Sequence, residues 1–492
     1  MTTSTSYAQA LQALLIIART QRASKGVPYV SVPLTSAVGG ILAKDVVAPL
    51  STPEHDTSAM DGYAVQSAAT ATASRAHPVR LRVRGRIAAG DEEVGQVVRP
   101  EGEKMEEEDG QTDENGDNNM SDVSSSCHEI TTGAIFPPFY DACIRHEDVV
   151  LLTNNTHILI TNPVSRGTNK RFAATDILKS TLVFCAGTAL TAAHILPLSS
   201  LGFTTLPLVP KPRIAVFSTG KELLCSRQPD VNGPFLMGAL RGLDVRAEWM
   251  GVLPDDLGVL RERLEEAVSQ GKRDGGWDVV LTSGGVSMGA WDYVTDVVKQ
   301  MGGRVVWHGV GVRPGHPVFC ALVGEKETDD AGESADGGKR TDAGRKTVMF
   351  GLPGNPGAAA ACFRFLVVPY LRWLMGLGRE PPLIARLDPE YDGGRYTSNG
   401  ANGHGSQSKK KAWIGDAFRH GILRSTAKGE LFVRLSEEQS PAKLGPFVSA
   451  NCWIHFPPPE KKGEERLGDG LVECYSIDGA RGVIPLADGG DS

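Results

Sequence analysis

The chain has little that would form a disulfide framework, a structural zinc site or a membrane span. Its eight cysteines include no C-x-x-C pair, and none lies near a histidine at the spacing of a zinc finger. This distribution predicts reduced thiols in a cytoplasmic protein. No apolar run approaches the ~18 residues that a membrane helix needs, so we expect no membrane span. The N-terminus lacks a basic start and a cleavage site, which favours an amphipathic helix over a signal peptide.

The negative net charge of the chain comes from a single acidic segment. The chain carries −7, while residues 101–126 contain ten acidic side chains and one lysine, which leaves +2 for the remainder. A nearly neutral body gives no reason to expect a nucleic-acid partner. The acidic tract 101–126 and the polar inserts 324–346 and 393–411 lack the large apolar residues of a core, so we predict that they are disordered.

Length and composition predict a soluble protein with several domains. The chain has 492 residues, with 41% hydrophobic and 22% charged side chains. Residues 212–375 alternate apolar strand-like runs with helical runs, which predicts a doubly wound, mostly parallel sheet. Residues 79–100 alternate apolar and polar side chains as antiparallel strands do, and residues 383–492 are also β-rich. The apolar helix near 357–375 is predicted to belong to the core. Four of its apolar side chains are expected to be buried: Ala359, Phe363, Phe365 and Leu366.

Three glycine-rich loops follow predicted strands of the α/β region. They are FSTGKEL (217–223), TSGGVSMGAWD (282–292) and GLPGNPGA (351–358). In such sheets ligands bind outside the carboxyl ends of the strands. Backbone N–H groups at a strand–loop–helix junction suit an anion, and the nearby Glu222 and Asp292 suit a metal that bridges to it. The alternative is that the glycines only form tight turns, which is common for a single loop but less so for three.

The motifs of the chain resemble one family. They are SAMDGYAV (58–65), GRIAAGD (85–91), ITTGAIFPP (130–138), VSRGTNKRFAATDI (164–177), FSTGKEL, TSGGVSMGAWDYV (282–294), VRPGHP (312–317) and GLPGNP (351–356). In this order they resemble the molybdopterin molybdenumtransferases of the MoeA type, including the E domain of gephyrin-like proteins. The resemblance covers nearly the whole chain.

The resemblance implies an enzyme activity and its substrates. Members insert molybdate into adenylylated molybdopterin, release AMP and form molybdenum cofactor with the help of a divalent metal, Mg²⁺ or alternatively Zn²⁺. It also implies a homodimer, with a cleft between the second domain of one subunit and the third and fourth domains of the other. Since no adenylylating domain is recognisable, we expect a separate molybdopterin adenylyltransferase and molybdoenzymes as possible protein partners. The alternative is a partial gene model from which the adenylylating domain is missing.

The resemblance places five acidic side chains in the active site: Asp61, Asp176, Glu222, Asp255 and Asp292. Asp255 and Asp292 are expected to hold a metal near the pyrophosphate, with Glu222 as a further metal or phosphate-side ligand. Asp61 and Asp176 are expected to orient pterin and molybdate. For Asp255, which precedes a predicted helix, a simple capping role is the alternative.

The resemblance also implies a set of ligand-binding residues. They are Thr132, Arg166, Lys170, Ser218, Thr219, Gly220, Ser283, Gly284, Gly285, Ser287, Gly289, Arg313, Pro314, His316, Pro353, Gly354 and Asn355. For the hydroxyl side chains, hydrogen bonding within the local turn is an equal alternative. For Arg166, Lys170 and the adjacent Arg171, the alternative is a solvated basic turn.

The basic loop VRPGHP departs from the K-P-G-K pattern of bacterial members. Arg313 keeps a fixed positive charge and adds bidentate geometry toward phosphate. His316 is charged only below about its reference pKa of ~6.5 unless a bound anion raises it. A neutral packing histidine is the alternative for this position.

The resemblance predicts four domains. They are a discontinuous dimerisation domain (1–50 and 149–207), an inserted β-rich domain (51–148), a molybdopterin-binding α/β domain (208–380) and a C-terminal β-barrel (381–492). A non-catalytic, gephyrin-like scaffold that binds partner proteins is the alternative function. The joint presence of Asp61, Asp176, Asp255 and Asp292 favours the enzyme, because a scaffold does not need them.

Overall fold

The computed structural model describes most of the chain. The described residues are 5–24, 29–91, 125–152, 156–225, 228–273, 276–285, 293–324, 346–388, 413, 415–458 and 470–477. The segments predicted to be disordered lie outside these residues except at their ends. At one of these ends, Ser126 is buried and begins a strand, so the predicted tract 101–126 extends too far toward the C-terminus.

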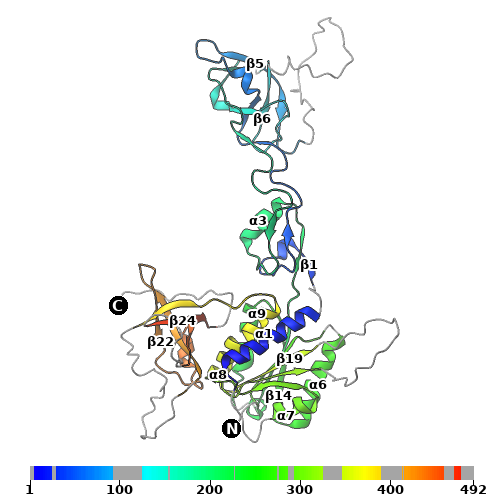
Figure 1. The fold of residues 1–492 in the computed structure, drawn as a ribbon, viewed down its shortest axis with the longest axis vertical. Coiled ribbons are helices and arrows are strands. Elements are labelled where there is room, and N and C mark those ends of the chain that lie inside the picture. The colour runs from blue at the N-terminus through cyan, green and yellow to red at the C-terminus, as the bar shows by residue number, and fades with distance from the viewer. Residues whose placement is uncertain are drawn as a thin grey trace, which may run out of the picture.

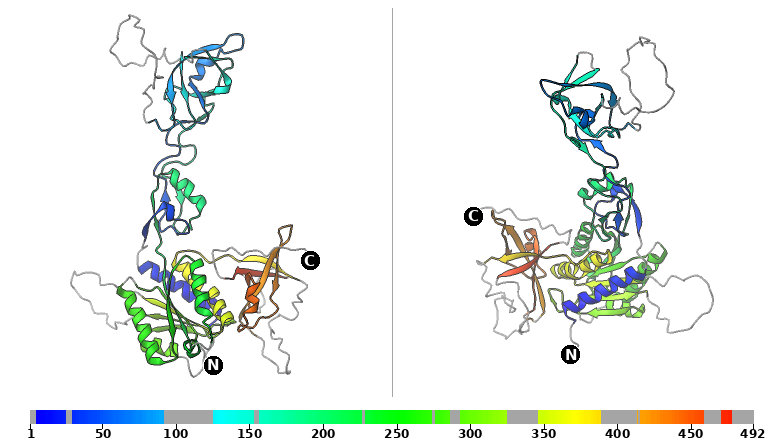
Figure 2. Two further views of the ribbon diagram at one scale, coloured as in Figure 1. Left: turned by 180° about the vertical axis from the view of Figure 1, so that it is seen from behind. Right: turned by 45° about the horizontal axis from the view of Figure 1, so that its top comes forward.

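The molecule is elongated and consists of four parts (Figure 1). A β-rich module that contains β5 and β6 forms one end. A small middle module with α3 and β1 connects it to an α/β unit at the other end, and a β-barrel lies beside that unit. Figure 2 shows the same order from two further directions.

The terminal β-rich module is built on one six-stranded sheet with the order β7-β4-β6-β5-β9-β8. Its strands are β4 (Gly62–Val65), β5 (Val79–Ile87), β6 (Ser126–Ile130), β7 (Ala142–Arg145), β8 (Val149–Leu151) and β9 (His157–Ile160). The sheet continues past the predicted domain boundary at 148, because β8 pairs with β9 and β9 pairs with β5.

The middle module consists of two short antiparallel pairs and one helix. The pairs are β1 (Val30–Pro33) with β12 (Thr205–Leu208) and β2 (Val46–Val47) with β11 (Leu182–Phe184), and the helix is α3 (Ala192–Ser200). A leucine-rich cluster fills the space between them. A third short pair, β3 (Thr57–Ser58) with β10 (Lys170–Arg171), lies on the two chain segments that lead to the terminal module.

The α/β unit is a six-stranded sheet between two layers of helices. Its strand order is β14-β13-β15-β19-β18-β16, in which the first four strands are parallel. The strands are β13 (Arg213–Thr219), β14 (Arg246–Leu253), β15 (Val279–Ser283), β16 (Arg304–His308), β18 (Phe319–Val323) and β19 (Thr347–Leu352). The helices are α4 (Lys221–Leu224), α5 (Asn232–Gly242), α6 (Leu257–Arg273), α7 (Tyr293–Gln300), α8 (Pro356–Cys362) and α9 (Val368–Leu374).

The first helix of the chain belongs to the core of the α/β unit. α1 (Tyr7–Ser24) buries Leu11, Leu14 and other apolar side chains in the same cluster as α9. Ser6 caps the helix, since its hydroxyl accepts from the Gln9 amide at 3.2 Å and the Gln9 side chain accepts from the Ser6 amide at 2.9 Å. The predicted grouping of residues 1–50 with 149–207 did not anticipate this position.

One long helical run lies in the core of this unit. α8, the π-helical turn η4 (Phe363–Val367) and α9 together form residues 356–374, and the four predicted core members of the run are buried. Contrary to the expectation from sequence, this run is long and apolar enough to cross a membrane by length and composition. However, 83% of it is buried inside the fold, as in the core helix of a globular domain.

The barrel is closed by strand pairing around a ring. β21 pairs with both β22 and β23, and the ring continues through β20 and β24. The strands are β20 (Leu383–Leu387), β21 (Asp416–Ser425), β22 (Leu431–Leu435), β23 (Cys452–Phe456) and β24 (Leu471–Ser476). β17 (Val312–Arg313), from the α/β unit, pairs with β21 and connects the two parts.

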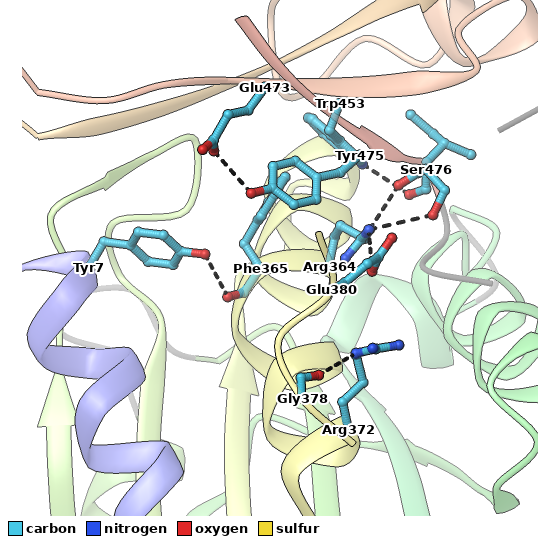
Figure 3. A network of polar contacts seen from close by, with 11 residues as sticks. Tyr7, Arg364, Phe365, Arg372, Gly378, Glu380, Trp453, Glu473, Tyr475 and Ser476 are labelled. Carbon is cyan, nitrogen blue, oxygen red and sulfur yellow. Dashed lines mark hydrogen bonds and ion pairs between the residues drawn. The ribbon is translucent and has the colours of Figure 1, made fainter. Parts of the chain in front are cut away.

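A buried arginine joins the barrel to the α/β unit (Figure 3). Arg364, in the π-helical turn, donates from Nε to the Ser476 carbonyl at 2.8 Å and from a terminal nitrogen to Glu380 at 2.8 Å. Tyr7 of α1 donates to the Phe365 carbonyl at 3.3 Å in the same region. A π-turn re-aims the side chains that it contains, which here directs Arg364 toward the barrel.

A histidine between two carboxylates lies at the same junction. His455 donates from Nδ1 to Glu473 and from Nε2 to Asp416, both at 2.8 Å. Because both ring nitrogens face acceptors, the geometry selects the imidazolium form. Burial of His455 opposes its charge, but the hydrogen bonds to the two carboxylates outweigh burial and raise its pKa. The Tyr7 ring lies edge-on to the His455 ring, with the ring centroids 6.0 Å apart, and Tyr475 donates to the same Glu473 at 3.0 Å.

Candidate active site

The three predicted loops leave adjacent strands at one edge of the sheet. Ser218 of β13 is level with Ser283 of β15, and Ser283 is level with Leu352 of β19. Thr219 is likewise level with Leu253 at the end of β14. The sequence prediction that these loops meet is therefore consistent with the registered strand ends, where parallel sheets bind ligands.

One side chain that the sequence reasoning missed holds two of these loops together. The Asn232 side-chain amide donates to the Ser283 hydroxyl at 2.7 Å and to the Gly354 carbonyl at 2.9 Å. Thr219 donates from its hydroxyl to the Ser283 carbonyl at 3.3 Å, which joins the third loop. These bonds fix the spacing of all three loops before any ligand binds.

The predicted hydroxyl residues are largely committed to internal hydrogen bonds. Ser218 donates to Asp230, a second residue that was missed, at 2.9 Å. Asp230 also accepts from the Gly233 amide at the start of α5, a capping signal that could have identified it. The hydroxyl proton of Ser283 has no acceptor in the described part of the chain, so this residue can donate to a ligand oxygen.

Glycine is required where two loops touch. Gly284 has φ of 97°, and a β-carbon there would fall 2.6 Å from the Thr219 hydroxyl and 2.7 Å from its carbonyl oxygen. Gly285 also has a positive φ, of 67°. At the third loop, a β-carbon on Gly354 would fall 3.7 Å from the α-carbon of Gly284. The loops therefore approach one another through backbone atoms.

Two of the predicted carboxylates flank the first loop. Asp255, just after β14, accepts from the Lys221 amide at 3.1 Å, whereas Asp256 caps α6 by accepting from the Val259 amide at 2.9 Å. The neighbouring Asp256, rather than Asp255, therefore caps α6. Glu222 is exposed in the first turn of α4, and a β-carbon on Gly220 would fall 2.5 Å from its carboxylate.

Glu222 and Asp255 suit a hydrated divalent cation better than a closed metal site. Both side chains are exposed and form no ion pair with the residues that the structure describes. Across those residues, no three histidine, cysteine or acidic side chains come together as a metal site would require. Mg²⁺ keeps several waters and needs only one or two carboxylates, whereas a structural Zn²⁺ needs four ligands. Asp292, the third predicted metal ligand, lies outside the described residues, as do Ser287 and Gly289.

The VRPGHP loop is held by its own backbone and by α8. His316 donates from Nδ1 to the Val310 carbonyl at 2.7 Å, which leaves Nε2 for another partner. A β-carbon on Gly315 would fall 2.2 Å from the Cys362 sulfur, so the loop is packed tightly against the helix. Arg313 and its neighbour Pro314 precede this contact, and Arg313 is exposed. The third loop ends at Asn355, whose carbonyl accepts from the amides of Ala358 and Ala359 in α8, and the Pro353 side chain is buried.

The remaining predicted acids lie on the terminal β-rich module. Asp61 accepts from the amide of Thr132 at 2.7 Å and from its hydroxyl at 3.0 Å, both through Oδ1. These bonds lower the pKa of Asp61 and keep it ionised. The side chain is exposed, so Oδ2 is available to a ligand. The next residue, Gly62, must be glycine, because a β-carbon there would fall 2.0 Å from the Ile144 carbonyl oxygen on the paired strand.

The basic cluster of this module divides into one buried and two exposed side chains. Lys170 is 10% exposed and forms an ion pair with Asp56 at 2.8 Å, which lowers the pKa of Asp56. It therefore has a structural partner that the sequence prediction did not include. Arg166 is 85% exposed and lies 4.0 Å from Asp141, while Arg171 lies 3.5 Å from the exposed Asp176.

The predicted site residues thus form two separate groups within one chain. Thr132, Asp61, Asp176 and Arg166 belong to the terminal module or to the segments that lead to it. Ser218, Ser283, Glu222 and Asp255 belong to the α/β unit at the opposite end of the molecule (Figure 1).

Two family models match consecutive parts of the chain. A family model described as the MoeA N-terminal region (domain I and II) matches residues 5–202. A second model, described as a probable molybdopterin binding domain, matches residues 215–373. The second match contains all three loops and their connecting residue Asn232.

Relatives and solved structures extend the similarity over most of the chain. A molybdopterin molybdenumtransferase of Synechococcus elongatus is 28% identical over 358 residues, which is 71% of this chain and 76% of the relative. One of Nostoc sp. is 29% identical over 367 residues, which is 72% of this chain and 71% of the relative. The crystal structure of the molybdopterin biosynthesis MoeA protein from Pyrococcus horikosii has a TM-score of 0.64 and 26% identity, covering 95% of this chain and 98% of that one. The chain belongs to the MoeA-type family of molybdopterin molybdenumtransferases.

Proposed function

We propose that this protein is a molybdopterin molybdenumtransferase that inserts molybdate into adenylylated molybdopterin. AMP is released in this reaction and molybdenum cofactor is formed. The observation that carries the proposal is the joining of three loops at adjacent strand ends by Asn232, next to the exposed carboxylates of Glu222 and Asp255. The names of the relatives support the same activity.

The three loops would bind the phosphate side of the substrate. Amides in the first turns of α4, α5 and α8 already donate within the chain, to Asp255, to Asp230 and to the Pro441 carbonyl. The donors to the pyrophosphate oxygens would therefore be the Ser283 hydroxyl and the Arg313 guanidinium, in loops whose glycines let the backbone approach the substrate closely. Because Asn232 and Thr219 already fix the loops, little ordering is needed when the substrate binds.

Glu222 and Asp255, together with Asp292, would hold a magnesium ion beside the pyrophosphate. When bound, the ion supplies positive charge that neutralises the phosphate oxygens. The two carboxylates fit this role because they are exposed and form no ion pair with a cation in the described part of the chain. Asp255 is also positioned, since the Lys221 amide fixes one of its oxygens.

The second group of residues would reach the same substrate from another copy of the chain. Asp61 belongs to the terminal module, and Arg166 and Asp176 belong to the segment that leads from it to the middle module. The terminal module lies at the end of the elongated subunit away from the α/β unit (Figure 2). In a homodimer with antiparallel subunits, this end of one subunit faces the α/β unit of the other. There Asp61 and Asp176 would orient the pterin, and Arg166 would bind the molybdate dianion.

The reaction places the protein between other proteins of the same cytoplasmic route. An adenylyltransferase must supply the adenylylated substrate, and molybdoenzymes must accept the product. Both are therefore candidate protein partners, and a cytoplasmic location is consistent with the eight unpaired cysteines.

Release of AMP by the purified protein tests this function. Adenylylated molybdopterin is incubated with the protein and Mg²⁺, with and without molybdate, and AMP is quantified by chromatography. We expect AMP release that depends on molybdate. A Ser283→Ala variant should be slower, while a Ser425→Ala variant, changed at the last residue of the barrel strand β21, should match the unaltered protein. Absence of AMP release with molybdate would refute the proposal.

A further inference from the structure

A cavity lies between the middle module and the α/β unit, away from the three loops. Its volume is about 870 Å³, which is within the usual range of small-molecule sites. Val32 and Leu190 line it from the middle module, and Arg213 and Asp278 line it at the starts of β13 and β15. Since the candidate active site is at the carboxyl ends of these strands, the cavity is at the opposite edge of the sheet.

The body of the cavity is apolar. Ile41, Leu190 and Leu208 contribute one wall, and Leu374 and Met375 contribute the wall on the side of α9. Such a surface gains little from a small hydrated ion, whereas it gains from each apolar group that leaves water. An occupant therefore needs an apolar body.

The polar part of the cavity has an excess of positive charge. Its charged lining residues are five cations, Arg22, Lys211, Arg213, Arg246 and Arg372, and three acids, Asp244, Asp278 and Glu380. The acids are already engaged: Lys211 pairs with Asp244, Arg364 binds Glu380, and the Arg213 amide donates to Asp278.

Three of the cations keep N–H groups for another partner. Arg22, Arg246 and Arg372 form no ion pair with the carboxylates that the structure describes. The terminal nitrogens of Arg22 would each be 2.7 Å from a β-carbon on Gly376, so its guanidinium lies flat against that glycine and is held in place. Arg372 donates from Nε to the Gly378 carbonyl at 3.0 Å, as Figure 3 shows, which fixes its fork.

Arg372 is the cation that gains most from a bound anion. Burial lowers its pKa, which means that its charge has lost water without a full replacement. An anion that binds the two terminal nitrogens would restore this lost solvation with two charge-assisted hydrogen bonds.

We propose that this cavity is a second ligand site, which binds a small amphipathic anion with an aromatic or acyl body and one carboxylate, sulfonate or phosphate head. The apolar wall takes the body, and Arg372 with Arg22 takes the head. The ligand would touch both the middle module and the α/β unit, so its binding would restrict their relative movement. This proposal does not depend on the proposed reaction, because none of its residues belongs to the loops.

Calorimetric titration of the full chain with two matched probes tests the proposal. The probes are 8-anilinonaphthalene-1-sulfonate and N-phenyl-1-naphthylamine, which has the same rings without the sulfonate. We expect one saturable site for the sulfonate, with binding weakened about tenfold in an Arg372→Gln variant, as expected for loss of a charge-assisted contact. The uncharged probe should bind more weakly and should not respond to this substitution. Equal binding of both probes, or of the sulfonate to both proteins, would overturn the assignment of Arg372.

A pair of tryptophan variants tests the location. Val38 lines the cavity and is 50% exposed, so Val38→Trp can place its indole inside without disturbing the core. Val150 is 55% exposed on the terminal module and supplies the control Val150→Trp. We expect Val38→Trp to abolish sulfonate binding and Val150→Trp to leave it unchanged, with unaltered circular dichroism in both. Equal sulfonate binding by the two variants would contradict the location, and Arg372→Gln tests the site independently if Val38→Trp does not fold.

Discussion

Substitution of Gly284 by alanine should separate the close approach of the loops from the cost of a positive φ. Gly302, in the same α/β unit, is the matched control, because it also has a positive φ, of 71°, but a β-carbon there has no neighbour within 4 Å. Both Gly284→Ala and Gly302→Ala should lose about 1–2 kcal/mol from the left-handed backbone alone. Only Gly284→Ala adds the contact with Thr219, for which overpacking typically costs a further ~1–3 kcal/mol.

The two variants should therefore differ in stability and, more strongly, in activity. The β-carbon at Gly284 can be accommodated only if the end of β13 moves, and that movement would displace Thr219 and the first loop from the second. Urea unfolding measures the loss of stability, and AMP release measures the site. We expect near-normal AMP release from Gly302→Ala and a large loss from Gly284→Ala. Equal losses in both assays would refute the argument that the loops are fixed by backbone contact.

Three further experiments test other parts of the account. Asn232→Ala and its control Asn451→Ala each remove a side-chain amide that bonds backbone or hydroxyl groups. Both variants should therefore lose about 1–3 kcal/mol of unfolding free energy, but only Asn232→Ala should slow AMP release. Equal AMP release by the two variants would argue against a role of Asn232 in the site. Asp255→Asn keeps an acceptor for the Lys221 amide but removes the charge, so the Mg²⁺ concentration for half-maximal AMP release should rise about tenfold; an unchanged Mg²⁺ titration would remove Asp255 from the metal site. The pKa of His455 in the folded protein is raised above its unfolded value of ~6.5. The extra stability of the unaltered protein over His455→Gln should therefore be complete below pH ~6.5 and should shrink as the pH rises through the raised pKa. A stability difference in urea unfolding that grows toward alkaline pH would contradict a charged His455.

The sequence predicted the place of the three loops because that prediction depends on local patterns. Each loop follows a continuous apolar run, and the ends of parallel strands meet at one edge. The burial of Phe363 and Phe365 was predicted for the same reason, since helical periodicity is a local signal. These predictions needed no knowledge of which distant segments touch.

The residues that connect the loops could not be found in this way. Asn232 bonds Ser283 and Gly354, which are 51 and 122 positions away in the chain. The helix that carries it, α5, begins with Asn-Gly-Pro, which is typical of a turn, although proline is tolerated in the first turn of a helix. β14, the next strand, was missed as well. Lys170 shows the opposite problem, because its sequence neighbours indicated an exposed basic turn, while its partner Asp56 comes from another segment.

The position of α1 shows a further limit of sequence patterns. Its apolar stripe predicts that one face is buried, but the stripe does not specify the surface that covers it. In the structure that surface is α9, more than three hundred residues later in the chain, rather than the neighbouring residues 29–50.

Subunit complementation tests the central claim, a molybdenum-inserting site built from two subunits, most directly. Asp61→Asn alters the terminal module and Asp255→Asn alters the α/β unit, and each variant alone should have little molybdate-dependent AMP release. If the two are unfolded and refolded together, about half of the dimers are mixed and each mixed dimer has one unaltered site, so about a quarter of the normal activity should return. Recovery of this activity is the predicted result. No recovery, although mixed dimers are present, would contradict a site shared between subunits.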